Sequence, residues 1–184
     1  EDLEFERFQI KAVSAIEEEL DRILKTRKQS RIQTIADMVI RNYGHLDEKI
    51  NFYQNLRSLE DYVSRHSLNV AILCAMITHV MNIRREEQYH TVCAALLHDM
   101  GKLKKHEDVY FGAPYSREDA IRNCETQEEA YSVIEDAFAT EGPAIRRICQ
   151  QAAGKQLDLF PEEGKESRYK MLEGSNVLLV ANRY

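Results

Sequence analysis

The most informative stretch of the chain runs Ala94-Ala95-Leu96-Leu97-His98-Asp99-Met100-Gly101-Lys102. It has the pattern of an apolar helix that ends at a glycine, which is a common way for helices to stop. The adjacent imidazole and carboxylate groups of His98 and Asp99 can both bind a divalent metal ion. The ammonium group of Lys102, just beyond them, can neutralise a phosphate group. The stretch therefore predicts a helix end that carries a metal and phosphate site.

Two long helical patterns surround this stretch. Apolar side chains recur every three or four residues over 59–80, which predicts a core helix with His66 on its buried side. Residues 86–100 are predicted to form the next helix, with small residues beside His98 that allow another helix to approach closely. Because inward-facing histidines on neighbouring helices can meet, we expect His66 and His98 to lie together. A core histidine with hydrogen-bonded nitrogens is the alternative for His66.

The position of Asp99 strengthens the metal interpretation. An aspartate in the last turn of a helix faces the negative end of the helix dipole and is disfavoured there. A cation held by His66, His98 and Asp99 would compensate for this, and Lys102 would supply part of the compensation. The alternative is a purely structural helix end, in which Gly101 is the cap and Asp99 pairs with Lys102 or with a nearby arginine.

The remaining periodic segments also predict helices, so we assign the chain to the all-α class. These helices are expected over residues 3–26, 29–43, 127–139, 143–152 and 166–182. The solvent-facing side of the first is expected to carry Glu17, Glu18, Glu19 and Asp21. Gly44 is expected to end the second. The apolar run from Val177 to Ala181 also fits a short buried strand, and residues 154–164 fit an exposed loop.

Composition and charge exclude several classes of protein. The net charge of −6 argues against a general binder of DNA, RNA or anionic membranes, although a small anionic ligand remains compatible with it. No uninterrupted apolar run is long enough to span a membrane, and no secretion signal opens the chain. The four cysteines lack C-x-x-C spacing and fit buried thiols. We therefore expect a protein of the reducing cytoplasm.

Two strings of residues resemble a known family. Asp61-Tyr62-Val63-Ser64-Arg65-His66-Ser67-Leu68-Asn69-Val70-Ala71 and the stretch from Ala94 to Lys102 are similar to the HD superfamily of metal-dependent phosphohydrolases. More narrowly, they resemble the HD-GYP branch, bacterial cyclic di-GMP phosphodiesterases with D-x-Y-x-x-x-H-S-x-x-V-A followed by A-x-L-H-D-I-G-K. The resemblance covers residues 56–103, and a weaker likeness to the V-A-D segment of that branch lies at 178–184. It implies an HD-domain bundle of about seven to eight helices.

The chain departs from the HD-GYP pattern in its second half. In that branch further histidines follow, including an adjacent pair, and then Gly-Tyr-Pro. Here all six histidines lie at or before His106, and Gly-Tyr-Pro is missing from 154–164. Gln150 and Gln151 stand roughly where the histidine pair is expected. Asn182 replaces the acid of V-A-D, which removes one negative charge from the expected site.

The resemblance implies metal ligands at His66, His98 and Asp99, and catalytic roles for Asp99 and Lys102, with Lys102 contacting phosphate. Two imidazoles and one carboxylate can hold one divalent ion of Fe, Mn, Mg, Zn or Ni, so we expect one ion per site or none. The implied reaction is hydrolysis of a phosphoester in a cyclic dinucleotide or another nucleotide. Because later ligands are lost, a catalytically inactive signalling or protein-interaction module is the alternative.

We expect two parts in the chain. Residues 1–45 would form a helical arm that packs on the bundle or links to an upstream domain, and residues 46–184 would form the HD domain. The amphipathic helix at 3–26 needs a partner surface, which a second copy of the chain could supply as a homodimer. Residues 110–115 could line the site as a lid or an aromatic wall, although a packed loop is the commoner structure. His106 could lie near the same cleft.

Overall fold

The computed structural model describes residues 2–46, 59–103, 116–154 and 170–183. Within these ranges the chain forms seven α-helices and two short 3-10 helices, with no strand. In chain order they are α1 (Asp2–Thr26), α2 (Ile32–Tyr43), α3 (Leu59–Val80), α4 (Arg85–Leu97), η1 (Met100–Leu103), α5 (Arg117–Phe138), η3 (Ala139–Glu141), α6 (Gly142–Gly154) and α7 (Glu173–Arg183). The all-α prediction is confirmed. The expectations for His106, residues 110–115 and most of the loop at 154–164 lie outside the described residues.

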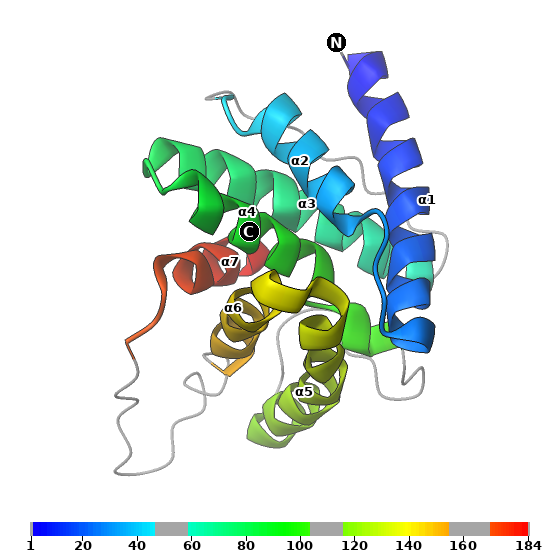
Figure 1. Cartoon of the computed structure of the whole chain (residues 1–184), viewed down its shortest axis with the longest axis vertical. Helices are drawn as coiled ribbons and strands as arrows, with labels where there is room; N and C mark the ends of the chain where they lie inside the picture. Colours follow the sequence, from blue (N-terminus) through cyan, green and yellow to red (C-terminus); the bar gives the residue numbers. More distant parts are fainter. Residues whose placement is uncertain (1, 47–58, 104–115, 155–169, 184) are drawn as a thin grey trace.

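The helices pack around a central pair, α3 and α4 (Figure 1). The first helix, α1, packs against α3, and α2 covers both α3 and α4. On the other side α6 and α7 pack on α4, while α5 packs on α6 and η1. An apolar core joins these helices, and its fully buried side chains include Ile16, Leu68, Leu96, Ile134 and Leu178. Both α1 and α2 contribute to this core, and the division of the chain at residue 45 stays a prediction.

Small side chains let α7 approach α4 closely, as the sequence predicted for this face of α4. Gly174 of α7 faces Thr91 of α4, and a Cβ atom at Gly174 would lie only 2.4 Å from Thr91 Oγ1. The glycine is therefore required by the close contact between the two helices. This contact fixes the start of α7, whose other end carries Asn182.

Several predicted helices have different bounds in the structure. The helix expected over 86–100 ends at Leu97, and the chain turns at His98 and Asp99 before η1 begins. The helix expected over 127–139 begins at Arg117, where the Ser116 hydroxyl accepts a hydrogen bond from the Asp119 backbone N–H at 3.2 Å. Such a cap can start a helix even where the turns that follow are polar. The prediction relied on apolar periodicity and therefore missed the polar segment 117–126.

The last helix is shorter than predicted. It begins at Glu173, whereas the expected helix began at 166, and residues 170–172 are not helical. Residues 166–169 lie outside the described part of the chain. The apolar run Val177 to Ala181 lies inside α7, so the alternative of a short strand is wrong.

None of the helices in the described part combines the length and the apolar composition that a membrane span needs. The four cysteines are all free thiols. Cys74, Cys93 and Cys149 are buried, as predicted, and Cys124 is partly exposed.

The sequence interpretation was wrong about Glu19, whose side chain is fully buried and not solvent-facing. Its carboxylate accepts hydrogen bonds from the backbone N–H groups of Ser30 and Arg31, both at 2.9 Å, and from the Ser30 hydroxyl at 2.8 Å. These donors directly precede α2, so a side chain of α1 caps the start of α2. Burial alone would raise the pKa of Glu19, but the hydrogen bonds and nearby Arg22 lower it on balance.

Replacing Glu19 by glutamine removes the charge from this cap. We expect Glu19→Gln to lower the free energy of unfolding by about 1–3 kcal/mol, because hydrogen bonds to a charged acceptor stabilise more than neutral ones. Since the folded-state pKa lies below the ordinary value of 4.5, this contribution is present above that pH and is lost as the pH falls below it. Urea unfolding at pH 7 and at pH 3 measures both effects. Equal destabilisation by Glu18→Gln, on the exposed side of α1, would contradict the assignment.

Candidate metal centre

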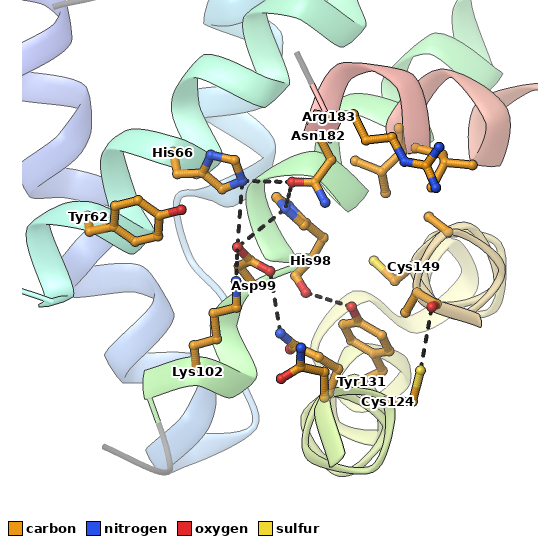
Figure 2. Close-up of a pocket in the computed structure, with 16 residues that line it drawn as sticks. Tyr62, His66, His98, Asp99, Lys102, Cys124, Tyr131, Cys149, Asn182 and Arg183 are labelled. Carbon is orange, nitrogen blue, oxygen red and sulfur yellow. Dashed lines mark hydrogen bonds and ion pairs between the residues drawn. The ribbon is translucent and has the colours of Figure 1, made fainter. Parts of the chain in front are cut away.

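The structure brings together the three predicted metal ligands. His66 projects from the middle of α3, and His98 and Asp99 occupy the turn after α4. One ligand atom from each residue lies within 4.8 Å of the others. The Nε2 atoms of His66 and His98 are both 3.6 Å from Asp99 Oδ2 (Figure 2). His98 and Asp99 are buried, and His66 is partly exposed.

Asn182 from α7 completes the cluster (Figure 2). Its side-chain Oδ1 atom lies 2.7 Å from His66 Nε2 and 3.1 Å from His98 Nε2. The acid position of the V-A-D segment is therefore inside the site, as the resemblance implied, but it carries a neutral amide. Two imidazole nitrogens, a carboxylate oxygen and an amide oxygen converge from three separate parts of the chain.

The backbone fixes the tautomer of His98. Its Nδ1 atom lies 2.6 Å from the carbonyl oxygen of Ala95, which can only accept a hydrogen bond. Nδ1 therefore carries the proton, and in the neutral ring Nε2 presents a lone pair. That lone pair faces another acceptor, the Asn182 oxygen. Acceptors that face one another across a small space match the needs of a cation, and an imidazole oriented through its other nitrogen is typical of metal ligands.

Lys102 of η1 also reaches the cluster, and its Nζ atom lies 3.0 Å from Asp99 Oδ2. Burial acts to raise the pKa of Asp99, but its electrostatic interactions with Lys102, His98 and His66 hold that pKa well below its usual range. Burial acts to lower the pKa of Lys102, and the Asp99 carboxylate more than offsets this. The pKa of His66 is lowered by burial, against the opposing effect of Asp99. At neutral pH the centre thus combines an ionised carboxylate, an ammonium group and a neutral His66.

A cavity of about 250 Å³ opens beside these residues. Its polar end is formed by the cluster and Lys102. Its other end lies between α5, α6 and α7 and is lined by Asn123 and by small or apolar side chains: Cys124, Cys149, Ala152, Ala153, Leu178 and Leu179. In Figure 2, Cys124 and Cys149 lie on the opposite side of the site from Tyr62 and His66. Exposed Arg183 also lines the cavity, next to Asn182.

Sequence reasoning missed two residues of α5 that contact this centre, Gln127 and Tyr131. No motif marks them. Their one signal is that they are polar side chains on the same side of the helix as Ala130 and Ile134, which are buried.

Gln150 and Gln151 make other contacts: Gln150 binds Glu128, and Gln151 binds Leu172 and Ser175. These two glutamines do not replace the missing histidine pair as members of the cluster.

Comparison with known proteins places the site in a family. Residues 63–170 match the HD domain family, and this range is more than half of the 184 residues. His66, His98, Asp99 and Lys102 lie within the match, and Asn182 lies beyond it. Comparison with the curated proteins and with the solved structures found no match. The chain therefore belongs to the HD domain family, whose members are generally metal-dependent phosphohydrolases.

Proposed function

We propose that this HD domain is a metal-dependent phosphohydrolase that holds one divalent ion between His66, His98 and Asp99. The convergence of two ring nitrogens and one carboxylate oxygen within 4.8 Å supports this proposal most directly. The oxygen of Asn182 is the fourth donor of the proposed site. Because histidine nitrogen and carboxylate oxygen suit several divalent ions, the donor set is compatible with Fe, Mn, Mg, Zn or Ni.

Each residue around the ion would have its own role in hydrolysis. A divalent ion supplies Lewis acidity, which polarises a phosphoryl oxygen and acidifies water. Lys102 would leave Asp99 Oδ2 and contact the phosphate, where its charge offsets the negative charge that develops during hydrolysis. Asp99 would serve either as a ligand or as the acceptor of the proton from water. His66 and Asn182 would each contribute a donor atom to the ion.

The shape of the cavity bears on the substrate. We infer a nucleotide-type ester, with its phosphate at the polar end and its organic group between α5, α6 and α7. More specifically, we propose that the substrate is a cyclic dinucleotide. The likeness of residues 61–71 and 94–102 to the HD-GYP branch supports this choice. The cavity of about 250 Å³ lies just below the range of roughly 300–1,000 Å³ for ligand pockets. A cyclic dinucleotide would therefore extend beyond it.

One observation favours a second candidate, an inactive module that binds a ligand or a partner. Asp99 is the sole carboxylate in the cluster of described residues, and Lys102 already neutralises it at 3.0 Å. With Asn182 in place of an acid, the centre attracts a dication less strongly than a site with two carboxylates. The same geometry could then bind a ligand without turning it over.

We also propose that two copies of the chain form a homodimer through α1. Most of the apolar side of this helix is buried against the bundle, but Leu3 and Ile10 are exposed by 63% and 55%. These two side chains lie two helical turns apart and are the apolar surface of α1 that a second copy could cover.

The metal centre predicts a definite stoichiometry and charge dependence. Titration of the purified chain with Mn²⁺ should show one ion per chain, and His98→Ala should abolish tight binding. Asn182→Asp should tighten binding about tenfold or more, because it adds a negative charge beside the ion. The matched control, Asn176→Asp, adds the same charge on an exposed part of α7 and should leave affinity unchanged. Two tightly bound ions per chain would contradict the proposal.

Turnover separates the enzyme from the inactive module. With Mn²⁺ and a panel of nucleoside monophosphates, cyclic di-GMP and bis(p-nitrophenyl) phosphate, we expect release of product by the wild-type chain. His98→Ala and Asp99→Asn should lower the rate by at least about 100-fold, since each removes a proposed ligand. Intact metal binding without turnover of any ester under any of the five metals would favour the module.

Light scattering tests the dimer. We expect the wild-type chain to have the mass of a dimer at micromolar concentrations and Ile10→Glu to have that of a monomer, because the charge would have to be buried at the interface. A strictly monomeric wild-type chain would rule out this interface.

A further inference from the structure

Two buried side chains of α5 contact the turn that carries His98 and Asp99. Gln127 and Tyr131 are only 5% and 2% exposed. They stand one helical turn apart, so they project from the same side of α5. The Tyr131 hydroxyl donates a hydrogen bond to the carbonyl oxygen of His98 at 2.6 Å (Figure 2). The Gln127 side chain accepts the backbone N–H of Gly101 at 3.1 Å, and its Nε2 faces Asp99 Oδ1 at 3.4 Å.

These contacts matter because the segment from His98 to Gly101 lies just beyond the end of α4. It consists of the turn at His98 and Asp99 and the first two residues of η1, so the backbone there is not held by a continuous α-helical ladder. Its carbonyl at His98 and its N–H at Gly101 find their partners on α5 instead. A Cβ atom at residue 101 would lie 2.5 Å from Gln127 Oε1, so Gly101 is what allows the amide to come this close.

The same contacts orient the carboxylate of Asp99. Gln127 faces Oδ1, and the other oxygen, Oδ2, faces the Nε2 atoms of His66 and His98 and the ammonium group of Lys102. A carboxylate that is contacted at one oxygen, and whose neighbouring backbone groups at His98 and Gly101 are held, has little freedom to rotate its second oxygen away from the imidazoles.

We propose that Gln127 and Tyr131 are positioning residues of the metal centre. They hold the segment from His98 to Gly101 so that Asp99 Oδ2 points at the space between the two ring nitrogens. This inference rests on the proposed function, because it treats His98 and Asp99 as metal ligands. Neither residue needs to touch the ion, and both act through the ligands that they hold.

The experiment compares Mn²⁺ affinity in the full chain, measured from the EPR signal of the free ion. Gln127→Met keeps the length of the side chain and removes its hydrogen bonds, and Tyr131→Phe removes only the hydroxyl. We expect each variant to bind Mn²⁺ about 10–100-fold more weakly, the usual effect of losing a group that orients a ligand. The matched control is Gln88→Met, because Gln88 of α4 is a partly buried glutamine that binds Ala75 O at 3.1 Å and Thr78 Oγ1 at 3.0 Å.

A purely structural role for the two residues would lower the melting temperature without a specific loss of metal affinity. Unchanged affinity in Gln127→Met and Tyr131→Phe would overturn the proposal, and so would an equal loss of affinity in Gln88→Met. If Gln127→Met does not fold, Tyr131→Phe decides the question alone. Failure of the wild-type chain to bind Mn²⁺ would overturn both this inference and the proposed function. A wild-type chain that binds Mn²⁺ but hydrolyses no ester would overturn the proposed hydrolysis alone.

Discussion

The negative charge of Asp99 is buried, at 5% exposure, and much of the bundle is arranged to compensate for it. A buried carboxylate is costly unless charged or hydrogen-bonding partners surround it. Here the partners arrive from separate elements: His66 from α3, Lys102 from η1 and Gln127 from α5. The packing of these elements against α4 is therefore coupled to the electrostatics of the site. Loss of either the charge or one of its partners leaves the other uncompensated in the interior.

The charge balance of the centre explains why a hydrolase and an inactive module share one geometry. Asp99 and Lys102 form a pair with no net charge, and Asn182 adds none. A dication at the ring nitrogens would compete with the ammonium group for Asp99 Oδ2, which lies 3.0 Å from Lys102 Nζ. Lys102 therefore links two states of the site. It compensates for Asp99 in the structure, and under the proposed function it would be released towards an anionic ligand when an ion takes its place.

The sequence predicted those parts of the fold and site that depend on local periodicity or on the motif. The stripe over 59–80 and the chain from Ala94 to Lys102 were enough to pair His66 with His98 and Asp99.

Other features were not predicted from the sequence. The start of α5 at Arg117 was missed because the helix begins at a serine cap and its first turns are polar. Glu19 was misplaced for a related reason: on a helical pattern it resembles its exposed neighbours, and its partners, Ser30 and Arg31, belong to the next segment. Gln127 was missed because its contacts with Asp99 and Gly101 are tertiary.

The contact between His66 and Asn182 joins positions that are 116 residues apart in the sequence. Contacts that close such long loops form late, whereas neighbouring helices such as α3 and α4 associate early. During folding the two imidazoles and Asp99 can thus assemble before α7 docks and brings Asn182 between the rings. Asn182 is therefore the donor that depends on the docking of α7, and the cluster is complete only when α7 has packed against α3 and α4.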